Sequence, residues 1–348
     1  MAQVEYDPML KALVVSGGSI GRRHIANLRT LEPSAHITLW RQHTAPGEAP
    51  DGIPGTDRIV YSLPDALTSD PDLAIVAGPA TMHVETGLAL AAVDIPLLVE
   101  KPLSHERQGA GQLVAFCRAR RIALMMGYNL RFYGPLQRLQ RAVAEGQIGR
   151  VISIRAEVGQ YLPDWRPDQD YRQGVSARSQ LGGGVVFELS HELDYVCWLA
   201  GDVQSVMSMA GRLGDLDIDV EDVAEILLRF QSGAIGSIHL DMVQRCLTRS
   251  CRVIGTEGTL VWNGLDHSVR VWRAGASGWE DLCPPSSLQR NDMYLDELRH
   301  FLCCVRDGRE PAVSGEDGLR ALDVALAVKE SARSSIAEEI EPRTLCHD

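Results

Sequence analysis

The stretch of residues 12–24 limits the fold of this chain more than any other part of the sequence. An apolar run suited to a buried strand leads into a glycine-rich turn, and the amphipathic run that follows indicates a helix. Gly18 would let the backbone approach a pyrophosphate, Gly21 would let helix and strand pack closely, and the helix N-terminus would offer unpaired N–H groups. The turn is therefore a predicted dinucleotide cradle.

This turn departs from the usual G-x-G-x-x-G pattern at its first position, which is a serine. The alternative interpretation is a glycine-rich strand-to-helix turn that binds no ligand. The residues predicted to form the cradle are Ser16, Gly18, Ser19, Ile20 and Gly21.

A second strand is predicted at residues 36–40, and the residue after it bears on the choice of cofactor. A dinucleotide-binding domain normally has an acidic residue about 20 residues beyond the turn, where it holds the adenosine ribose. Here Arg41 occupies that place, and the first carboxylate after the strand is Glu48. Because a guanidinium pairs with a 2′-phosphate, Arg41 favours NADP. NAD is the alternative if Arg41 is only a solvated charge at a strand end.

Length and composition predict two domains and exclude several classes of function. The chain has 348 residues, more than one ordinary core needs. Its formal charge of -12 argues against a nucleic-acid partner. Apolar runs are too short to cross a membrane, and the first ten residues lack the apolar core of a signal peptide. The eight cysteines are scattered without a C-x-x-C motif, so we predict reduced thiols, a cytoplasmic location and no metal site.

Strands and helices alternate through residues 12–126, which predicts a doubly wound, mostly parallel sheet of the Rossmann type. Further strands are expected at 73–77 and 96–99, with a helix at 84–92 between them. Ligands of such sheets gather at the carboxyl ends of the strands. Besides the turn, the residues predicted to contact the cofactor there are Arg41, Pro79, His83, Glu100 and Lys101.

Lys101 is the predicted catalytic residue of this first domain. It lies between Glu100, whose charge would hold the ammonium, and Pro102, which fixes the direction of the chain. A lysine partly desolvated beside a cofactor can hydrogen-bond a substrate hydroxyl and pass a proton. The alternative is a solvated lysine at the end of a strand.

Beyond residue 126 most strand patterns follow one another without an intervening helix. After a helix at 135–145, strands are predicted at 151–158, 203–209, 223–230, 234–242, 252–254 and 259–262. This spacing predicts a large, mostly antiparallel, open sheet in an α+β domain. Two helices, at 294–305 and 319–331, close the chain and are expected to pack back on the first domain. We predict a cofactor domain of residues 1–125 and a substrate and oligomerisation domain of residues 126–348.

One helix, from about residue 186 to residue 199, is predicted to carry the catalytic groups of the second domain. Glu188, His191 and Asp194 lie three residues apart and would form a stripe on one face. The imidazole of His191 suits a group that takes the substrate proton as hydride leaves. Glu188 or Asp194 would orient it. The alternative is a helix histidine that only bonds a neighbour.

The loop of residues 161–172 combines aromatic, basic and turn residues. Aromatic faces stack on sugar rings, and arginines bind carboxylates or phosphates. The alternative is a surface loop that only packs on the protein. The loop residues predicted to contact substrate are Tyr161, Trp165, Arg166 and Tyr171.

An ordered set of motifs makes the chain resemble the glucose-fructose oxidoreductase, inositol dehydrogenase and rhizopine catabolism (Gfo/Idh/MocA) family. The resemblance covers nearly the whole chain and implies a Rossmann domain followed by an α/β domain. The open sheet of that second domain often serves oligomerisation, so we expect a homodimer or homotetramer. The motifs are 14–23, Gly78-Pro79-x-x-x-His83, Glu100-Lys101-Pro102, 127–132, Gly146-x-Ile148-Gly149, 182–184, His191, Asp194 and Glu297-x-x-x-Phe301.

The resemblance also implies NAD(P)-linked oxidation or reduction at a carbon of a sugar or cyclitol. In it, the lysine of the Glu-Lys-Pro motif and a histidine of the second domain assist proton transfer. The 161–172 loop looks like that of a subgroup acting on modified, often nucleotide-linked sugars. Many members carry an acid four residues before the histidine, where this chain has Phe187, so the assisting acid stays open between Glu188 and Asp194. Further residues assigned to the substrate are Asn129, Arg131 and Asp194.

Two other functions fit the same fold. The first is a non-catalytic regulator that senses cofactor and sugar, against which the presence of both Lys101 and His191 argues. The second is the reduction of an imine or tetrapyrrole-like substrate, which the sugar-type loop does not suggest.

Overall fold

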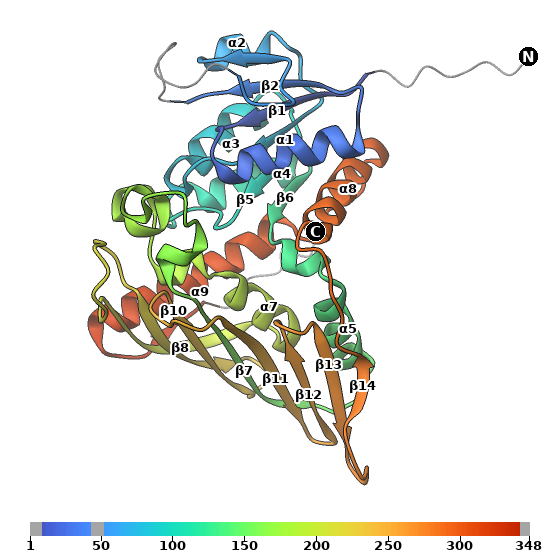
Figure 1. Ribbon diagram of the computed structural model, residues 1–348, viewed down its shortest axis with the longest axis vertical. Coiled ribbons are helices and arrows are strands. Elements are labelled where there is room, and N and C mark those ends of the chain that lie inside the picture. Colours follow the sequence, from blue (N-terminus) through green and yellow to red (C-terminus); the bar gives the residue numbers. More distant parts are fainter. Residues whose placement is uncertain (1–8, 43–51, 342–348) are drawn as a thin grey trace, which may run out of the picture. The chain divides into compact units, whose positions relative to one another are not determined.

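The computed structural model describes residues 9–42 and 52–341 and divides the chain into two compact units (Figure 1). The first unit consists of Met1–Leu103, Gln108–Gly127 and Tyr294–Gly315. The second consists of Ser104–Arg107, Tyr128–Met293 and Glu316–Asp348. Of the two closing helices, α8 (Asp292–Asp307) therefore belongs mainly to the first unit and α9 (Gly315–Ser334) to the second.

The first unit contains a six-stranded parallel sheet in the order β3-β2-β1-β4-β5-β6. The order reverses between β1 and β4, which is where doubly wound sheets bind nucleotides. The predicted parallel sheet is confirmed. Its strands are β1 (Lys11–Val15), β2 (His36–Trp40), β3 (Arg58–Val60), β4 (Leu73–Val76), β5 (Leu97–Glu100) and β6 (Leu124–Gly127).

Helices connect the parallel strands of this unit except β2 and β3, between which the described residues contain no helix. Those after β4 and β5 pack closely, and a Cβ on Gly87 would lie 2.8 Å from the side chain of Leu113. The helices are α1 (Ser19–Leu31), α2 (Leu63–Leu67), η1 (Ala80–Met82), α3 (His83–Ala91) and α4 (Ala110–Arg120).

The second unit contains a nine-stranded sheet in the order β14-β13-β12-β11-β7-β10-β9-β8-β15. Every neighbouring pair is antiparallel except β7 and β10, which run parallel, so the predicted mostly antiparallel sheet is confirmed. The strands are β7 (Val151–Gly159), β8 (Val203–Gly211), β9 (Val223–Phe230), β10 (Ile235–Asp241), β11 (Thr248–Gly255), β12 (Gly258–Asn263), β13 (Ser268–Arg273), β14 (Glu280–Cys283) and β15 (Glu338–Glu339).

One face of this sheet is covered and the other is open. Along β9, Ile226 and Leu228 are buried whereas Leu227 and Arg229 are exposed, which is the alternation expected of a half-covered strand. On the covered side, Ser208 Oγ of β8 donates to the backbone of α9 at 2.6 Å. The other helices of this unit are η2 (Asn129–Phe132), α5 (Gly134–Ala144), η3 (Leu162–Trp165), η4 (Tyr171–Gln173), η5 (Val175–Ala177), η6 (Ser179–Leu181), α6 (Val185–Glu188) and α7 (His191–Ala200).

The prediction of one continuous helix from about residue 186 to residue 199 is wrong. The chain instead forms α6 and α7, with Leu189 and Ser190 between them. The apolar residues of the predicted helix are nevertheless buried, including Val186 and Leu193. Hydrophobic spacing thus identified the packed side, but it did not reveal the break.

Two properties of the whole chain can be followed in the described residues. The seven cysteines there are free thiols, and Cys346 lies outside the described residues. No helix within residues 9–42 and 52–341 has the length and apolar character needed to cross a membrane.

Candidate active site

The glycine turn after β1 leaves an open approach above the start of α1. A Cβ on Gly21 would lie 2.1 Å from the backbone oxygen of Ser16, so α1 can pack on the turn only with glycine there. A Cβ on Gly18 would have no neighbour nearer than 3.8 Å, and Gly18 is exposed. Ser19 and Ile20 begin α1, whose first turn has no side-chain cap. This geometry suits an anion bound by backbone N–H groups.

Ser16 replaces the first glycine of the usual pattern, and it takes a left-handed backbone with a φ of 79°. Its N–H donates to the backbone oxygen of Trp40 at 2.9 Å, which joins the turn to the end of β2. The left-handed conformation explains why glycine is usual at this position.

Arg41 lies beside the same turn. It is buried at the end of β2, and a Cβ on Gly17 would lie 4.0 Å from its Nε atom. The backbone N–H of Arg41 donates to the oxygen of Val60 at 2.9 Å, which fixes the start of its side chain. Glu48, the first carboxylate after the strand, lies outside the described residues.

His83 connects the two turns that follow β4 and β5. Its Nδ1 atom lies 2.8 Å from the backbone oxygen of Pro102, and its Nε2 atom lies 2.9 Å from that of Gly78. Burial lowers the pKa of His83, and the two carbonyl contacts oppose that change. The side chain therefore holds the segments that carry Pro79 and Lys101 in a fixed relation.

Glu100 is bound from within the unit by His24 of α1. His24 Nε2 donates to Glu100 Oε1 at 2.7 Å, and the backbone N–H of Lys101 donates to Glu100 Oε2 at 3.3 Å. A Cβ on Gly127 would lie 2.9 Å from that same Oε2 atom, so β6 leaves room for the carboxylate. The peptide between Lys101 and Pro102 is cis. His24 was not among the predicted site residues.

A second carboxyl group, that of Glu297 on α8, is enclosed in the same unit. Its side chain is fully buried, and neither oxygen has a hydrogen-bond partner. Burial raises the pKa of Glu297 well above its ordinary value of 4.5, and the charge of Glu100 raises it further. Glu297 therefore keeps its proton to a higher pH than an ordinary glutamate does. In the sequence, Glu297 stood out only as part of the Glu297-x-x-x-Phe301 motif of the family, and no role was predicted for it.

In the second unit, His191 is the first residue of α7. Its ring meets the buried ring of Tyr128 edge-on, with 5.6 Å between the ring centres. The Tyr128 hydroxyl lies 3.5 Å from Oγ of Ser190. Burial raises the pKa of Tyr128, so this hydroxyl stays neutral. The aromatic contact limits the orientation of the imidazole.

The predicted stripe of Glu188, His191 and Asp194 does not form, because α6 and α7 are separate helices. Glu188 Oε2 accepts a hydrogen bond from Ser176 Oγ at 2.7 Å. Asp194 is buried against Arg131, whose Nε and Nη2 atoms each donate to one of its carboxylate oxygens at 2.7 Å.

This Arg131–Asp194 pair ties η2 to α7. Burial raises the pKa of Asp194, and the guanidinium of Arg131 opposes the rise. The same guanidinium lies 4.8 Å from the centre of the Trp198 ring. Asn129, also predicted to contact substrate, is buried at the start of η2.

A second ion pair next to His191, with a buried carboxylate and a partly exposed arginine, was not predicted from the sequence. Arg249 of β11 donates from Nε and Nη2 to the two oxygens of Glu192, at 2.8 and 2.9 Å. Glu192 is fully buried in the first turn of α7. The two residues are 57 positions apart in the sequence, so no local sequence pattern indicates that they pair. Only the tertiary structure could reveal the pair.

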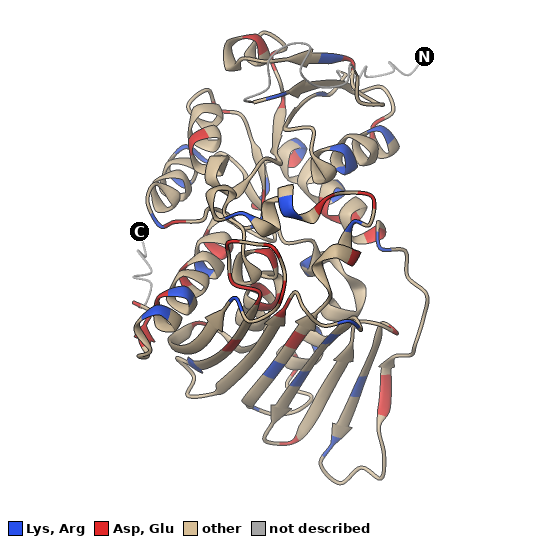
Figure 2. Cartoon of the chain, turned by 60° about the vertical axis from the view of Figure 1, so that its left-hand side comes forward, with Lys and Arg blue, Asp and Glu red and all other residues tan. Residues whose placement is uncertain are grey.

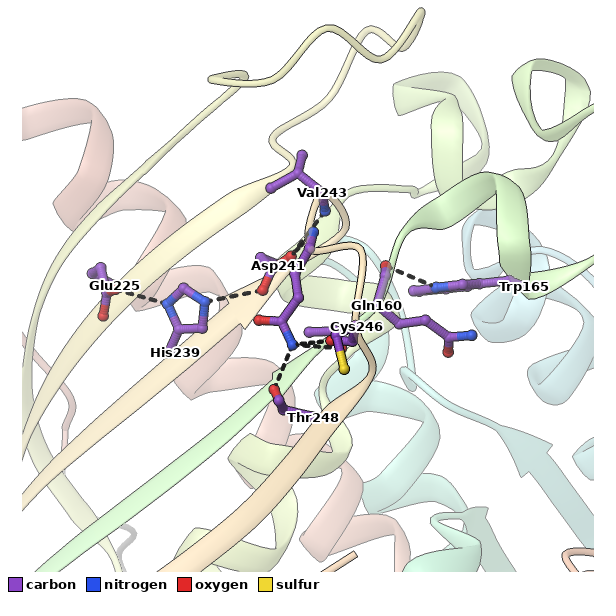
Figure 3. Close-up of polar contacts among 10 residues, drawn as sticks. Gln160, Trp165, Glu225, His239, Asp241, Val243, Cys246 and Thr248 are labelled. Atoms are coloured by element: carbon purple, nitrogen blue, oxygen red, sulfur yellow. Dashed lines mark hydrogen bonds and ion pairs between the residues drawn. The ribbon is translucent and has the colours of Figure 1, made fainter. Parts of the chain in front are cut away.

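The predicted loop residues separate into two groups. Tyr161 and Trp165 lie at the end of β7, where Trp165 Nε1 donates to the backbone oxygen of Gln160 at 3.0 Å (Figure 3). Arg166 follows directly and is exposed. Tyr171 lies elsewhere, because its hydroxyl accepts a hydrogen bond from the N–H of Asp217 at 3.2 Å, between β8 and β9.

These features define the class of the protein, which has one unit with a Rossmann sheet and a second unit with a large open sheet. Comparison with family models identifies the family. Residues 10–128 match the model described as "Oxidoreductase family, NAD-binding Rossmann fold". Residues 140–337 match "Oxidoreductase family, C-terminal alpha/beta domain". The chain belongs to the Gfo/Idh/MocA family of oxidoreductases, and the resemblance inferred from its motifs is confirmed.

Individual relatives agree with this assignment. The chain is 28% identical to myo-inositol 2-dehydrogenase of Thermotoga maritima over 342 residues, which is 94% of this chain and 98% of that protein. Levoglucosan dehydrogenase in complex with NADH has a similar fold, with a TM-score of 0.85, 20% identity and coverage of 95% and 99% of the two chains. The WlbA dehydrogenase from Bordetella pertussis, in complex with NADH and UDP-GlcNAcA, is also similar in fold. Its TM-score is 0.80 at 22% identity, and the match covers 96% of this chain and 100% of that one.

The prediction that the chain is an oxidoreductase is confirmed by these comparisons. The relatives named are enzymes, which gives no support to a non-catalytic sensor. The matched family model is described as NAD-binding, which supports NAD(H) as the cofactor class. The preference for NADP over NAD stays a prediction.

We predict that Glu297→Gln stabilises the protein increasingly as pH rises. Because the pKa of Glu297 is raised on folding, its neutral form contributes stability below about pH 4.5 that is lost as pH rises toward the folded pKa. The glutamine side chain does not titrate in this range. The free energy of unfolding of the variant, minus that of the unaltered chain, should therefore grow by up to about 1.4 kcal/mol for each unit by which the pH rises. Urea unfolding between pH 5 and pH 9 measures it. Glu85→Gln, an exposed change on α3, is the matched control, and a pH-independent difference for Glu297→Gln would contradict the prediction.

Proposed function

We propose that this chain is an NAD(P)-dependent dehydrogenase or reductase that acts on a hydroxyl-bearing carbon of a sugar, a sugar derivative or a cyclitol. The observation that carries the proposal is that the open approach at Gly18 and the braced Glu-Lys-Pro turn belong to the carboxyl edge of one parallel sheet. Relatives named for inositol and levoglucosan support the substrate class. The UDP-GlcNAcA complex of another relative supports a nucleotide-linked sugar as one form of it.

The proposed cofactor site uses residues that fit a dinucleotide. Gly18, Ser19 and Ile20 would bind the pyrophosphate through backbone N–H groups, and Pro79 would line the approach after β4. His83 and Glu100 are buried, so they would act by holding the turns that contact the cofactor. The bound cofactor supplies the nicotinamide ring that accepts or donates the hydride.

We propose that Lys101 and His191 handle the proton of the substrate hydroxyl. The Lys101 ammonium would donate a hydrogen bond to that oxygen, and the imidazole of His191 would take its proton during oxidation or return it during reduction. Glu188 is the better candidate for the assisting acid, because both oxygens of Asp194 are bonded to Arg131. Arg131 and Asp194 would then support the substrate site by holding η2 on α7.

The catalytic assignment predicts the behaviour of two single variants and their combination. Lys101→Met and His191→Asn should each lower kcat by about 10²- to 10⁴-fold, because each removes a positioned proton-transfer group. If both act in one step, the double variant should lose much less than the product of the two losses. The assay follows NAD(P)H absorbance with myo-inositol, levoglucosan and glucose as substrates.

Lys11→Met is the matched control, since Lys11 is the residue at the start of β1 that pairs with Asp70. Cofactor binding by each variant is checked by thermal shift. Unchanged turnover in Lys101→Met would remove that residue from the mechanism. Cofactor binding by the unaltered chain without hydride transfer across the panel would instead favour the sensor function.

We further propose that Arg41 gives the site a preference for NADP(H) over NAD(H). Its buried position beside Gly17, with no acidic residue at the end of β2, supports a contact with the 2′-phosphate. The NADH complexes of the relatives support NAD(H), which stays the alternative.

Arg41→Gln should lower the affinity for NADPH about tenfold or more and change that for NADH little, because a charge-assisted contact to one phosphate is lost. Thermal shifts over a concentration series of each nucleotide measure both affinities. Arg58→Gln, an exposed change on β3, is the control. A stronger shift with NADH in the unaltered chain, or equal losses for both nucleotides in the variant, would contradict the proposed preference.

The open face of the nine-stranded sheet is the proposed surface for a homodimer or homotetramer. Strand register places Met207, Leu227, Ser237, Arg155 and Arg252 in one row across five adjacent strands. Figure 2 shows basic and acidic segments distributed over these strands. A face that combines exposed apolar side chains with charges of both signs can be self-complementary in a two-fold assembly.

Leu227→Glu should therefore reduce the molecular mass measured by light scattering toward that of a single chain. Leu227 is 59% exposed, so the change should leave the fold intact and act through desolvation of the new charge in the contact. Val93→Glu, at a residue 50% exposed in the first unit, is the control. An unchanged mass for Leu227→Glu would contradict the proposed surface.

The proposed setting is the cytoplasm, with a small molecule as the substrate. The free thiols of the described cysteines support a reducing compartment. The formal charge of -12 supports a partner other than nucleic acid.

A further inference from the structure

Two connections of the second unit leave the sheet side by side. β7 and β10 run parallel, and their last residues, Gly159 and Asp241, are paired. β11 begins beside them, where Thr248 pairs with Gly159. The segments 160–165 and 242–247 therefore start from the same edge (Figure 3).

Hydrogen bonds join these two segments. Leu162 N–H donates to the oxygen of Met242 at 2.9 Å, and Gln160 N–H donates to that of Asp241 at 3.3 Å. Oδ1 of the buried Asp241 accepts from the N–H groups of Val243 and Gln244, at 2.9 and 2.6 Å. The 242–247 connection is thus fixed to the sheet on both sides of its first turn.

The side chain of Gln244 adds a further anchor. Its Nε2 atom donates to Oγ1 of Thr248 at 2.7 Å and to the oxygen of Gly159 at 3.4 Å. The residue that follows, Arg245, consequently extends from an ordered piece of backbone.

Arg245 holds an exposed positive charge over an aromatic ring. Its Cζ atom lies 3.7 Å from the centre of the Tyr161 ring, a distance at which guanidinium and ring attract each other. Within the described ranges no carboxylate lies within ion-pair distance of Arg245. The ring thus orients a cation that has no carboxylate partner among the described residues.

The same edge adjoins the catalytic candidate of this unit. Arg249, the second residue of β11, is bonded to Glu192, and His191 precedes Glu192 in α7. The Arg249–Glu192 pair therefore fixes the start of α7 beside β11. Arg245 lies in the connection that leads into this strand.

We propose that Arg245, held over Tyr161, is an oxyanion subsite that selects a sugar carrying a carboxylate or a phosphate. A planar guanidinium binds such groups through two parallel hydrogen bonds, and Trp165, four residues after Tyr161 in the same connection, would supply an aromatic face for the sugar ring. A chain with a formal charge of -12 needs a local cation of this kind to retain an anionic substrate. The inference rests on the proposed function, whose substrate class it narrows.

Binding of matched sugars to the NADH-loaded protein tests this inference. Calorimetric titration compares glucose with glucuronate and with glucose 1-phosphate, for the unaltered chain and for Arg245→Gln. We expect the unaltered chain to bind one anionic sugar about tenfold or more tightly than glucose, and Arg245→Gln to reduce that ratio to about one. The anion with the larger ratio identifies carboxylate or phosphate as the selected group.

Two further variants separate charge recognition from a structural role. Arg245→Lys keeps the charge but loses the planar fork, so it should keep part of the preference. Arg141→Gln, an exposed change on α5, should leave the preference unchanged. Equal affinity for glucose and both anions in the unaltered chain, no binding of either anion, or a preserved preference in Arg245→Gln would each overturn the inference. Equal losses for neutral and anionic sugars would overturn it as well, because they indicate only a packing role.

Failure of the inference can be told apart from failure of the proposed function. Binding to NADH-loaded protein requires no hydride transfer, so a selective site without turnover would retain Arg245 as a subsite and reject the enzymatic role. Turnover of neutral sugars, with equal binding of neutral and anionic sugars, would support the enzymatic role and reject Arg245 as a subsite.

Discussion

The hydrogen bond between His24 and Glu100 is the contact on which the geometry of the first unit depends. It joins the helix that follows the glycine turn to the residue directly before Lys101. Because both groups are buried, losing the bond would leave Oε1 of Glu100 without its His24 partner inside the protein, a change that costs about 1–3 kcal/mol. The proposed pyrophosphate cradle and the proposed catalytic lysine are thus held in register by one interaction.

Ion pairs of two buried carboxylates have the corresponding role in the second unit. Arg131–Asp194 and Arg249–Glu192 attach the first turns of α7 to η2 and to β11. Each pair uses both carboxylate oxygens, which fixes direction as well as distance. These pairs also account for the acidic residues around His191, since two of the three carboxylates near it are engaged by arginines.

The sequence predicted most elements of the fold because their signals are local. Strand β9 was predicted with its observed ends, and helix α5 within one residue at each end, from alternation and from a 3.6-residue period. The strands β3, β13, β14 and β15 were missed, and of these the short segment 280–283 of β14 has little apolar pattern. The break between α6 and α7 was missed for another reason. The apolar spacing continues across it, and the two ion pairs that fix α7 involve partners more than fifty residues away.

The sequence by itself determined the Rossmann sheet, the glycine turn, the Glu-Lys-Pro motif and the family, because each depends on residues that are neighbours along the chain. Only the tertiary structure decided which charges are engaged within the protein and which face outward. Glu297 and His24 are enclosed beside Glu100, whereas Arg245 is displayed over Tyr161. Burial and the identity of a partner depend on residues brought together by folding, and these partners are separated by tens to hundreds of positions in the sequence.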